Sequence, residues 1–121
     1  MSNILEHNGR IFVIGSYAVS KALKSIGFSL SNIGEAIDTH FFELINAVIF
    51  YSAEYPAFKE GRVTDFSEAD VYELLDSTGG YNGAFIQKFT KVMLESINPG
   101  EAAKETEINA KKKHSPLRSL E

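Results

Sequence analysis

The amino-acid sequence predicts a single α+β domain in which helices dominate and a β-hairpin comes first. Two short apolar segments flank Asn8-Gly9, a dipeptide suited to the positive φ angles of a tight hairpin turn. Apolar residues then recur at helical spacing in several segments, and the stretch 38–55 is apolar on nearly all sides. We therefore expect one globular domain over residues 1–99, made of the hairpin and four or five packed helices, and a charged, flexible tail over residues 100–121.

The two-residue loop also predicts how the hairpin strands pair. The expected cross-strand pairs are Ile4–Val13, Leu5–Phe12 and His7–Arg10. One face then carries Leu5, Phe12 and Ile14, and the other carries Ile4, Ile11 and Val13. Both faces are apolar, and an isolated hairpin is barely stable in water. We expect the hairpin to pack on the helices, with an edge that can pair with a strand of another subunit.

Two helices should follow the hairpin. Gly15-Ser16 closes the second strand and caps the first helix, whose apolar residues repeat at helical spacing. Gly27 supplies a left-handed stop, and Phe28 can fold back on the end of that helix. A shorter helix is indicated over residues 30–37.

The apolar stretch after them is expected to form the central helix of the core. Nine of the eleven residues from Phe41 to Tyr51 are apolar, and only Glu43 and Asn46 interrupt them. Such a helix must be covered on most sides, by its own domain or by a partner. Pro56 should end it and leave residues 57–66 as the longest internal loop.

Two further helices complete the expected domain. Ser67 and Asp70 match a variant of the capping box at the start of the first of them. The second is expected over about residues 82–97, where apolar residues share one side. The Asn-Pro-Gly sequence at residues 98–100 should end it.

Composition narrows the class of protein. The chain has no cysteine, which excludes disulfides and zinc sites built on cysteine. Residues 1–100 carry seven basic and twelve acidic side chains, a net charge of −5, whereas residues 101–121 carry five basic and four acidic, a net charge of +1. An acidic body argues against nucleic acid as the main partner. The first residues lack a signal-peptide pattern and the apolar stretch is too short to cross a bilayer, so we expect a cytoplasmic protein without membrane contact.

Candidate catalytic residues are few. Glu43 on the apolar helix would be an acid–base catalyst if burial raised its pKa, with His40 beside it. The favoured alternative is that Glu43 borders solvent or pairs with a lysine. Gly79-Gly80 with Gly83 follows no strand and precedes no lysine, which indicates a turn rather than a phosphate-binding loop. The sequence predicts no catalytic residue, no cofactor and no metal site.

Three aromatic residues around Pro56 are the best candidates for binding a partner. Tyr51, Tyr55 and Phe58 are spaced four and three residues apart. Aromatic residues at the end of an element often anchor a partner protein. The alternative, that they only cap the core, stays equally open.

Several segments carry a resemblance to a known family. They are residues 8–12 (Asn-Gly-Arg-Ile-Phe), residues 22–30 (Ala-Leu-Lys-Ser-Ile-Gly-Phe-Ser-Leu), the apolar helix and residues 67–75 (Ser-Glu-Ala-Asp-Val-Tyr-Glu-Leu-Leu). In this order, over residues 5–97, they resemble the small tail assembly chaperones of long-tailed bacteriophages. The resemblance implies a non-catalytic protein that binds the tape measure protein, keeps it soluble and helps deliver tail tube subunits. It also implies a place in the host cytoplasm and absence from the mature virion.

The lysine run in the tail fits the same family. In many such phages a ribosomal frameshift near the end of the gene appends a second domain to a fraction of the chains. Lys111, Lys112 and Lys113 can be encoded by a slippery A-AAA-AAG run, so they are a candidate frameshift-encoded segment. The alternative is an ordinary solvated tail.

Two other functions stay open at this stage. One is a neck or head–tail joining protein that remains in the virion, and the other is a small enzyme using Glu43 and His40. For the chaperone we expect a homo-oligomer, because the hairpin and the central helix carry more apolar surface than a domain of this size can bury.

Overall fold

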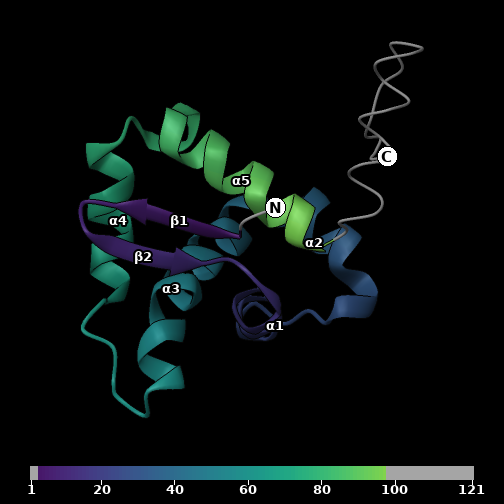
Figure 1. Cartoon of the computed structure of the whole chain (residues 1–121). Coiled ribbons are helices and arrows are strands. Elements are labelled where there is room, and N and C mark those ends of the chain that lie inside the picture. Colours follow the sequence, from purple (N-terminus) through teal and green to yellow (C-terminus); the bar gives the residue numbers. More distant parts are fainter. Residues whose placement is uncertain (1–2, 98–121) are drawn as a thin grey trace.

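The structure, a computed structural model, describes residues 3–97 and confirms the predicted helix-dominated α+β class (Figure 1). Within these residues a two-stranded antiparallel hairpin precedes five α-helices. The elements are β1 (Ile4–His7), β2 (Arg10–Val13), α1 (Ser16–Ser25), η1 (Leu30–Asn32), α2 (Ile33–Thr39), α3 (Phe41–Lys59), α4 (Glu68–Ser77), η2 (Gly80–Asn82) and α5 (Ala84–Ile97). The expected helix stop at residues 98–100 and the expected tail over residues 100–121 lie outside the described part of the chain.

The hairpin forms with the predicted register. The strands pair Ile4 with Val13, Leu5 with Phe12, Glu6 with Ile11 and His7 with Arg10. The turn residues Asn8 and Gly9 have φ angles of 52° and 81°, the left-handed values that a type I′ turn requires. Phe12 is buried, whereas Ile11 on the opposite face is 47% exposed. The hairpin therefore covers the core with only one of its two apolar faces.

An arginine holds the hairpin turn against the loop between α3 and α4. Arg10 Nη1 lies 3.1 Å from Asp65 Oδ1, and the Arg10 guanidinium lies 4.8 Å from the centroid of the Phe66 ring. The hydrogen bond from Arg10, followed by its positive charge, lowers the pKa of the Asp65 carboxyl. The Phe66 ring in turn meets Phe12 edge-on, with centroids 5.8 Å apart. A surface ion pair adds little stability, so its main effect is to orient the turn.

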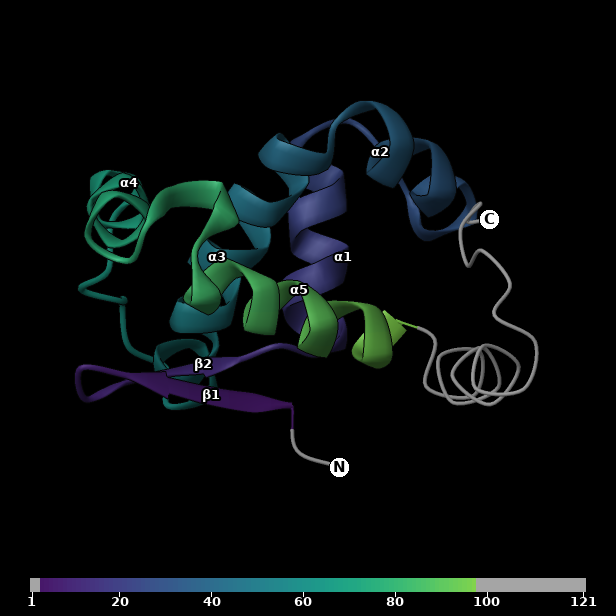
Figure 2. The same cartoon turned by 90° about the horizontal axis from the view of Figure 1, so that it is seen from above.

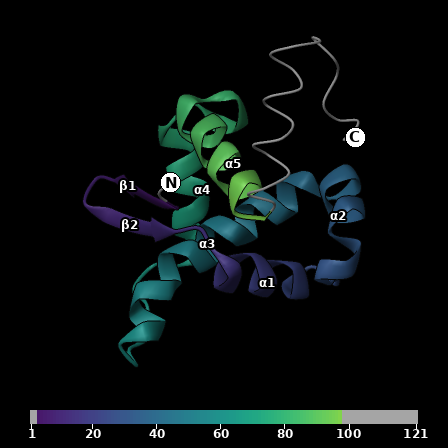
Figure 3. The same ribbon diagram turned by 45° about the vertical axis from the view of Figure 1, so that its right-hand side comes forward.

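Most of the other elements pack on α3. Contacts to α3 come from α1, β2, α2 and α4, and α5 lies against α1 and η2. Figure 2 shows α4 and α1 on opposite sides of α3, with α5 in front of α1. Figure 3 shows the last turns of α3 projecting away from the rest of the fold. The position of α3 therefore sets the position of the remaining elements.

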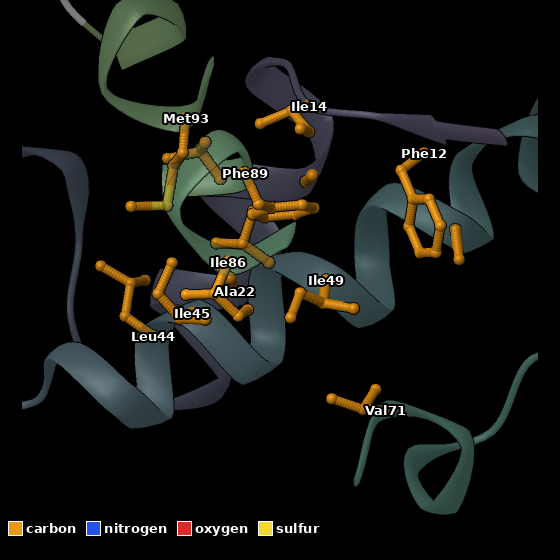
Figure 4. Packing of buried hydrophobic residues seen from close by; sticks show 14 of the residues in the cluster. Phe12, Ile14, Ala22, Leu44, Ile45, Ile49, Val71, Ile86, Phe89 and Met93 are labelled. Atoms are coloured by element: carbon orange, nitrogen blue, oxygen red, sulfur yellow. The ribbon is translucent and has the colours of Figure 1, made fainter. Parts of the chain in front are cut away.

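One hydrophobic core joins the hairpin to the helices. Figure 4 shows Phe89 of α5 gathered with Leu44 and Ile45 of α3, and all three side chains are fully buried. Phe12 of β2 enters the same cluster, with ring centroids 5.8 Å from Phe85 and 6.3 Å from Phe89. Edge-to-face aromatic contacts of this kind add to the stability that burial alone provides.

The central helix starts later than predicted. Asp38 and Thr39 belong to α2, and His40, with φ −136° and ψ 40°, separates α2 from α3. The Thr39 hydroxyl donates to the Glu35 carbonyl over 2.8 Å and lies 2.7 Å from His40 Nδ1. Such local side-chain bonds compete with the helical backbone bonds, which accounts for the break before Phe41.

The prediction that Pro56 ends the central helix is wrong, since α3 continues through Pro56 to Lys59. Proline has no N–H and leaves the Ser52 carbonyl without its helical donor. The Ser52 hydroxyl is itself fully buried and has no hydrogen-bond partner among the described residues. Ala57 in the following turn is 3% exposed, so packing holds that turn in place despite the missing bond.

A glycine, rather than the proline, ends α3. Gly61 has a φ of 73°, the left-handed conformation that glycine adopts without strain. Its N–H donates to the Phe58 carbonyl over 3.1 Å, and the Arg62 N–H donates to the Ala57 carbonyl over 2.9 Å. These two bonds form a Schellman motif, the same device that the sequence predicts after the first helix. The loop expected over residues 57–66 is correspondingly shorter.

The caps of the other helices are mostly as predicted. At α4, the Asp70 N–H donates to Ser67 Oγ over 3.2 Å and the Ser67 N–H donates to Asp70 Oδ2 over 2.8 Å, a complete capping box. The first helix is capped within the predicted Gly15-Ser16 pair, with Gly15 as an N-cap without a side-chain bond and Ser16 as the first helical residue. Glycine is tolerated at that position. The last helix begins at Ala84, close to the predicted start.

Burial of α3 predicts the effect of truncating its core residues. Because Ile45 is fully buried, Ile45→Ala should lower the free energy of unfolding by about 2–5 kcal/mol, through lost burial and a residual cavity. Ile11→Ala removes the same atoms from a side chain that is 47% exposed, and should have less than about half that effect. Chemical denaturation measures both. Equal losses would show that α3 is not the centre of the core.

The proline inside α3 predicts a stabilising substitution. Pro56→Ala restores the N–H facing the Ser52 carbonyl, and should raise the free energy of unfolding by about 1–3 kcal/mol. Pro56→Gly restores the same N–H but adds backbone freedom, and should gain about 1 kcal/mol less. Chemical denaturation of the two variants and the parent protein tests this order. A loss of stability in Pro56→Ala would show that the proline ring contributes packing that outweighs the missing bond.

Candidate functional site

Four aromatic side chains gather where the start of α1 meets the end of α3. We call them the tyrosine cluster: Tyr17, Tyr51, Tyr55 and Phe58. The Tyr17 ring stacks on Phe58, with centroids 4.5 Å apart and an interplanar angle of 27°. It also lies 5.1 Å from the Tyr55 ring and 6.5 Å from the Tyr51 ring. The three residues singled out in the sequence are thus joined by a fourth from another helix.

The path of α3 explains why these side chains line up. Residues three and four apart lie on one side of a helix, and Tyr51, Tyr55 and Phe58 have this spacing. Phe58 keeps its place in the row only because α3 continues beyond Pro56. Phe58 is 56% exposed, and the three tyrosines of the cluster are half-buried. The cluster therefore presents aromatic faces to solvent on the projecting end of α3 seen in Figure 3.

A hydrogen bond within the cluster ties the two helices together. The Tyr17 hydroxyl donates to Glu54 Oε1 over 2.8 Å. Burial, followed by the hydrogen bond to Glu54 and the charge of Glu54, raises the pKa of Tyr17 from 10.0 to about 12. Tyr17 therefore remains protonated at neutral pH and keeps donating to the carboxylate. The bond holds the Tyr17 ring in register with Phe58.

Two lysines give the cluster a positive rim. Lys21 Nζ lies 5.8 Å from the centroid of the Tyr17 ring, and Lys59 Nζ lies 5.4 Å from that of Tyr55. Within residues 3–97 neither ammonium group forms an ion pair with a carboxylate. Contacts between a cation and an aromatic face are individually weak when exposed. The cluster therefore combines aromatic faces with two positive charges that have no carboxylate partner among the described residues.

Sequence reasoning missed Tyr17 and Glu54. The two residues are 37 positions apart, so no local pattern joins them. One signal was available, because Tyr17 precedes Ala18, which faces the core, and stands four residues before the exposed Lys21. A large aromatic residue at the edge of the buried face of an amphipathic helix is placed to contact a neighbouring element near the surface.

A groove lies on α3 between the end of α1 and the first turns of α4. Its volume is about 380 Å³, and we call it the α3 groove. Its lining combines apolar side chains with two carboxylates, and includes Ile26, Ala47, Phe50, Val71, Glu43 and Glu68. Tyr51 lines this groove and also belongs to the tyrosine cluster, so the two surfaces adjoin.

The residues of the enzyme hypothesis lie near each other in the chain but form no joint site in the described structure. Glu43 is exposed and lines the α3 groove. His40 is also exposed, with its ring 5.1 Å from that of Phe28 and its Nδ1 bonded to Thr39. No hydrogen bond joins Glu43 to His40 within residues 3–97. The same part of the chain contains no cluster of three His, Asp or Glu side chains suited to a metal ion.

The lysine run belongs to a part of the chain that the structure leaves undescribed. Lys111, Lys112 and Lys113 lie outside residues 3–97, so their proposed origin in a frameshift stays a prediction from the sequence. Among the described helices, none has the length and apolar character needed to cross a membrane.

The raised pKa of Tyr17 predicts how stability depends on pH. The unfolded chain releases the tyrosine proton near pH 10 and the folded chain near pH 12, so the unfolded state binds fewer protons in this range. This contribution to stability is complete below about pH 10 and is lost as the pH rises towards 12. Tyr17→Phe should remove it, while Tyr72→Phe, outside the cluster, should not. Denaturation at several alkaline pH values, compared between these variants, measures the difference.

A second measurement isolates the cause of the shift. Near-ultraviolet titration should show a late-ionising tyrosine signal that disappears in Tyr17→Phe and shifts to lower pH in Glu54→Gln. If Glu54→Gln leaves the titration unchanged, burial alone accounts for the raised pKa of Tyr17.

Comparisons of the chain with protein-family models, with curated proteins and with solved structures find no match.

Proposed function

We propose that the chain is a non-catalytic tail assembly chaperone of a long-tailed bacteriophage, which binds the tape measure protein and assists assembly of the tail tube. The observation that carries the proposal is the tyrosine cluster, an aromatic surface on the projecting end of α3. The order of segments that resembles this family, with a hairpin before a set of helices, supports the choice of client.

The chemistry of the cluster suits a protein client better than a small molecule. Tyrosine rings offer large, rigid and amphipathic contact area, and they are common among the residues that dominate binding energy. Phe58 is 56% exposed and sits at the outer edge of the stack with Tyr17. An extended, helical and aggregation-prone protein such as a tape measure protein has many apolar side chains that such a surface can cover.

Further apolar side chains support self-association. Ile4 and Ile11 on the outer face of the hairpin are 53% and 47% exposed. Exposed apolar surface on a small domain often marks contacts between subunits. We infer that the protein acts as a homo-oligomer, with the hairpin contributing to the subunit contact and the client sites repeated around the assembly.

The alternative within phage proteins is a neck or head–tail joining protein. That protein would stay in the virion, whereas a chaperone acts in the host cytoplasm and is absent from mature particles. Mass spectrometry of purified virions separates the two functions.

Co-expression with the tape measure protein of the same phage tests the proposal. The chaperone should keep the tape measure protein in the soluble fraction, and Tyr55→Ala with Phe58→Ala should weaken their binding by about tenfold or more. Phe42→Ala is a matched control, because this residue lies on the same helix with nearly the same exposure. It should leave binding within about twofold of the parent protein.

Two results would count against the proposal. If the tape measure protein stays insoluble when co-expressed with this chain, the proposed chaperone function is wrong. If Phe42→Ala weakens binding as much as Tyr55→Ala with Phe58→Ala does, the tyrosine cluster is not the binding site. Analytical ultracentrifugation tests self-association separately. A strict monomer at high concentration would contradict the homo-oligomer.

A further inference from the structure

The α3 groove offers a second binding surface with a different chemistry. We propose that it binds one amphipathic helix of a partner protein, which inserts an apolar side chain between α1 and α4 and places lysine or arginine beside it. The inference rests on the proposed function for the choice of a helical client. Beyond the proposed function, it specifies which surface of the chain makes the contact and which charge the partner carries there.

The floor of the groove is one stripe of α3. Glu43, Asn46, Ala47 and Phe50 stand at positions i, i+3, i+4 and i+7, and all of them line the groove. From Glu43 to Tyr51 this stripe is about 12 Å long, which is slightly more than two helical turns. Figure 2 shows α1 and α4 on opposite sides of α3. Residues at the end of α1 and in the first turns of α4 line the groove and form its walls. A floor and walls of this kind fit a short stretch of helix lying in the groove.

A small residue in the middle of the stripe leaves room for an apolar anchor. Ala47 lies between the larger side chains of the floor, and the hollow above it measures about 380 Å³. Ile26 from the end of α1 and Val71 from α4 supply apolar walls. Tyr72 also lines the groove and is 50% exposed, in a position to cover the anchor from the side. Burial of one aliphatic side chain of a partner among these groups is favourable.

The charge of the groove selects a basic partner. Glu43 and Glu68 come from different helices, both are exposed, and neither forms an ion pair within the described residues. No lysine or arginine is among the described residues that line the groove. The rings of Tyr51 and Tyr72 also attract cations. A helix with lysine or arginine beside its apolar anchor therefore complements the groove, while an acidic helix is repelled.

The tyrosine cluster provides an internal contrast. Its rim carries Lys21 and Lys59, so it favours acidic neighbours, whereas the α3 groove favours basic ones. The two surfaces share Tyr51. A second copy of this chain is a poorer occupant of the groove, because residues 1–100 carry a net charge of −5. The lysines at 111–113 of the chain's own tail have the matching charge, so the test must distinguish them from a partner.

Two peptides of about 18 residues serve as probes, since shorter helices are marginal in water. Both carry leucine at anchor positions on one face. One has lysine beside the anchors, and the other has glutamate at the same positions. Fluorescence anisotropy with the full-length protein should show that the lysine peptide binds at least about tenfold more tightly than the glutamate peptide, and that added salt reduces the difference.

Charge-reversal variants locate the binding to the groove. Glu43→Lys with Glu68→Lys should weaken binding of the lysine peptide by about tenfold or more and should strengthen binding of the glutamate peptide. Glu35→Lys with Asp76→Lys is the matched control, because both residues are exposed and neither lines the α3 groove. It changes the net charge equally and should change binding less than about threefold. Ala47→Phe fills the hollow without a change of charge and should also abolish binding of the lysine peptide.

The outcomes are decisive in either direction, provided that thermal melts show each variant folded. Loss of binding in both groove variants, with the control unaffected and the glutamate peptide rescued by charge reversal, supports the inference. Equal binding of the two peptides, or equal effects of the two double reversals, overturns it. A peptide of residues 101–121 that displaces the lysine peptide, together with tighter probe binding after deletion of that segment, would assign the groove to the chain's own tail instead. None of these assays uses a phage partner, so their failure is separate from a failure of co-expression.

Discussion

The constraint on which this structure depends is the need to cover α3, a helix that is apolar on nearly every side. A chain of 121 residues has few elements with which to do so. β2, α1, α2 and α4 each cover part of α3, and α5 closes the core against α1 with Phe89 and Met93. The parts of α3 that these elements leave exposed include the stripe through Ala47 and the side chain of Phe58 beyond Pro56. Both candidate binding surfaces are therefore parts of the same helix, and they are consequences of its composition rather than additions to the fold.

Local interactions explain what could be predicted from the sequence. The register of the hairpin follows from Asn8-Gly9, and the start of α4 follows from Ser67 and Asp70, because in each instance the decisive atoms lie within a few residues. The end of α3 could not be predicted in this way. Pro56 removes one backbone bond, but the buried Ala57 and the Schellman motif at Gly61 hold the next turn, and this balance depends on tertiary packing.

The same distinction applies to the sites. Tyr51, Tyr55 and Phe58 could be selected from their spacing, because one helix carries all three. Their contact with Tyr17, and the α3 groove with its walls from α1 and α4, arise from pairing of segments far apart in the chain. Periodicity shows which side of a helix is apolar, but not which neighbour covers it. The polar interruptions of α3 show this plainly. Glu43 faces solvent at the groove, whereas Asn46 accepts a hydrogen bond from Tyr81 over 2.7 Å.

The contacts of the Phe12 ring constrain how the protein folds during its synthesis. Its aromatic neighbours are Phe66, Phe85 and Phe89, all of which are synthesised long after the hairpin. The hairpin is synthesised before the helices, and α3 covers only part of its buried face, since the contacts of Phe12 with Phe85 and Phe89 form only after α5 has emerged. Because such long-range contacts form late, the domain must complete its fold cooperatively after α5 has been synthesised, rather than element by element. Until then the nascent chain itself exposes an apolar strand pair, and so has the same need for shielding that it is proposed to meet in its client.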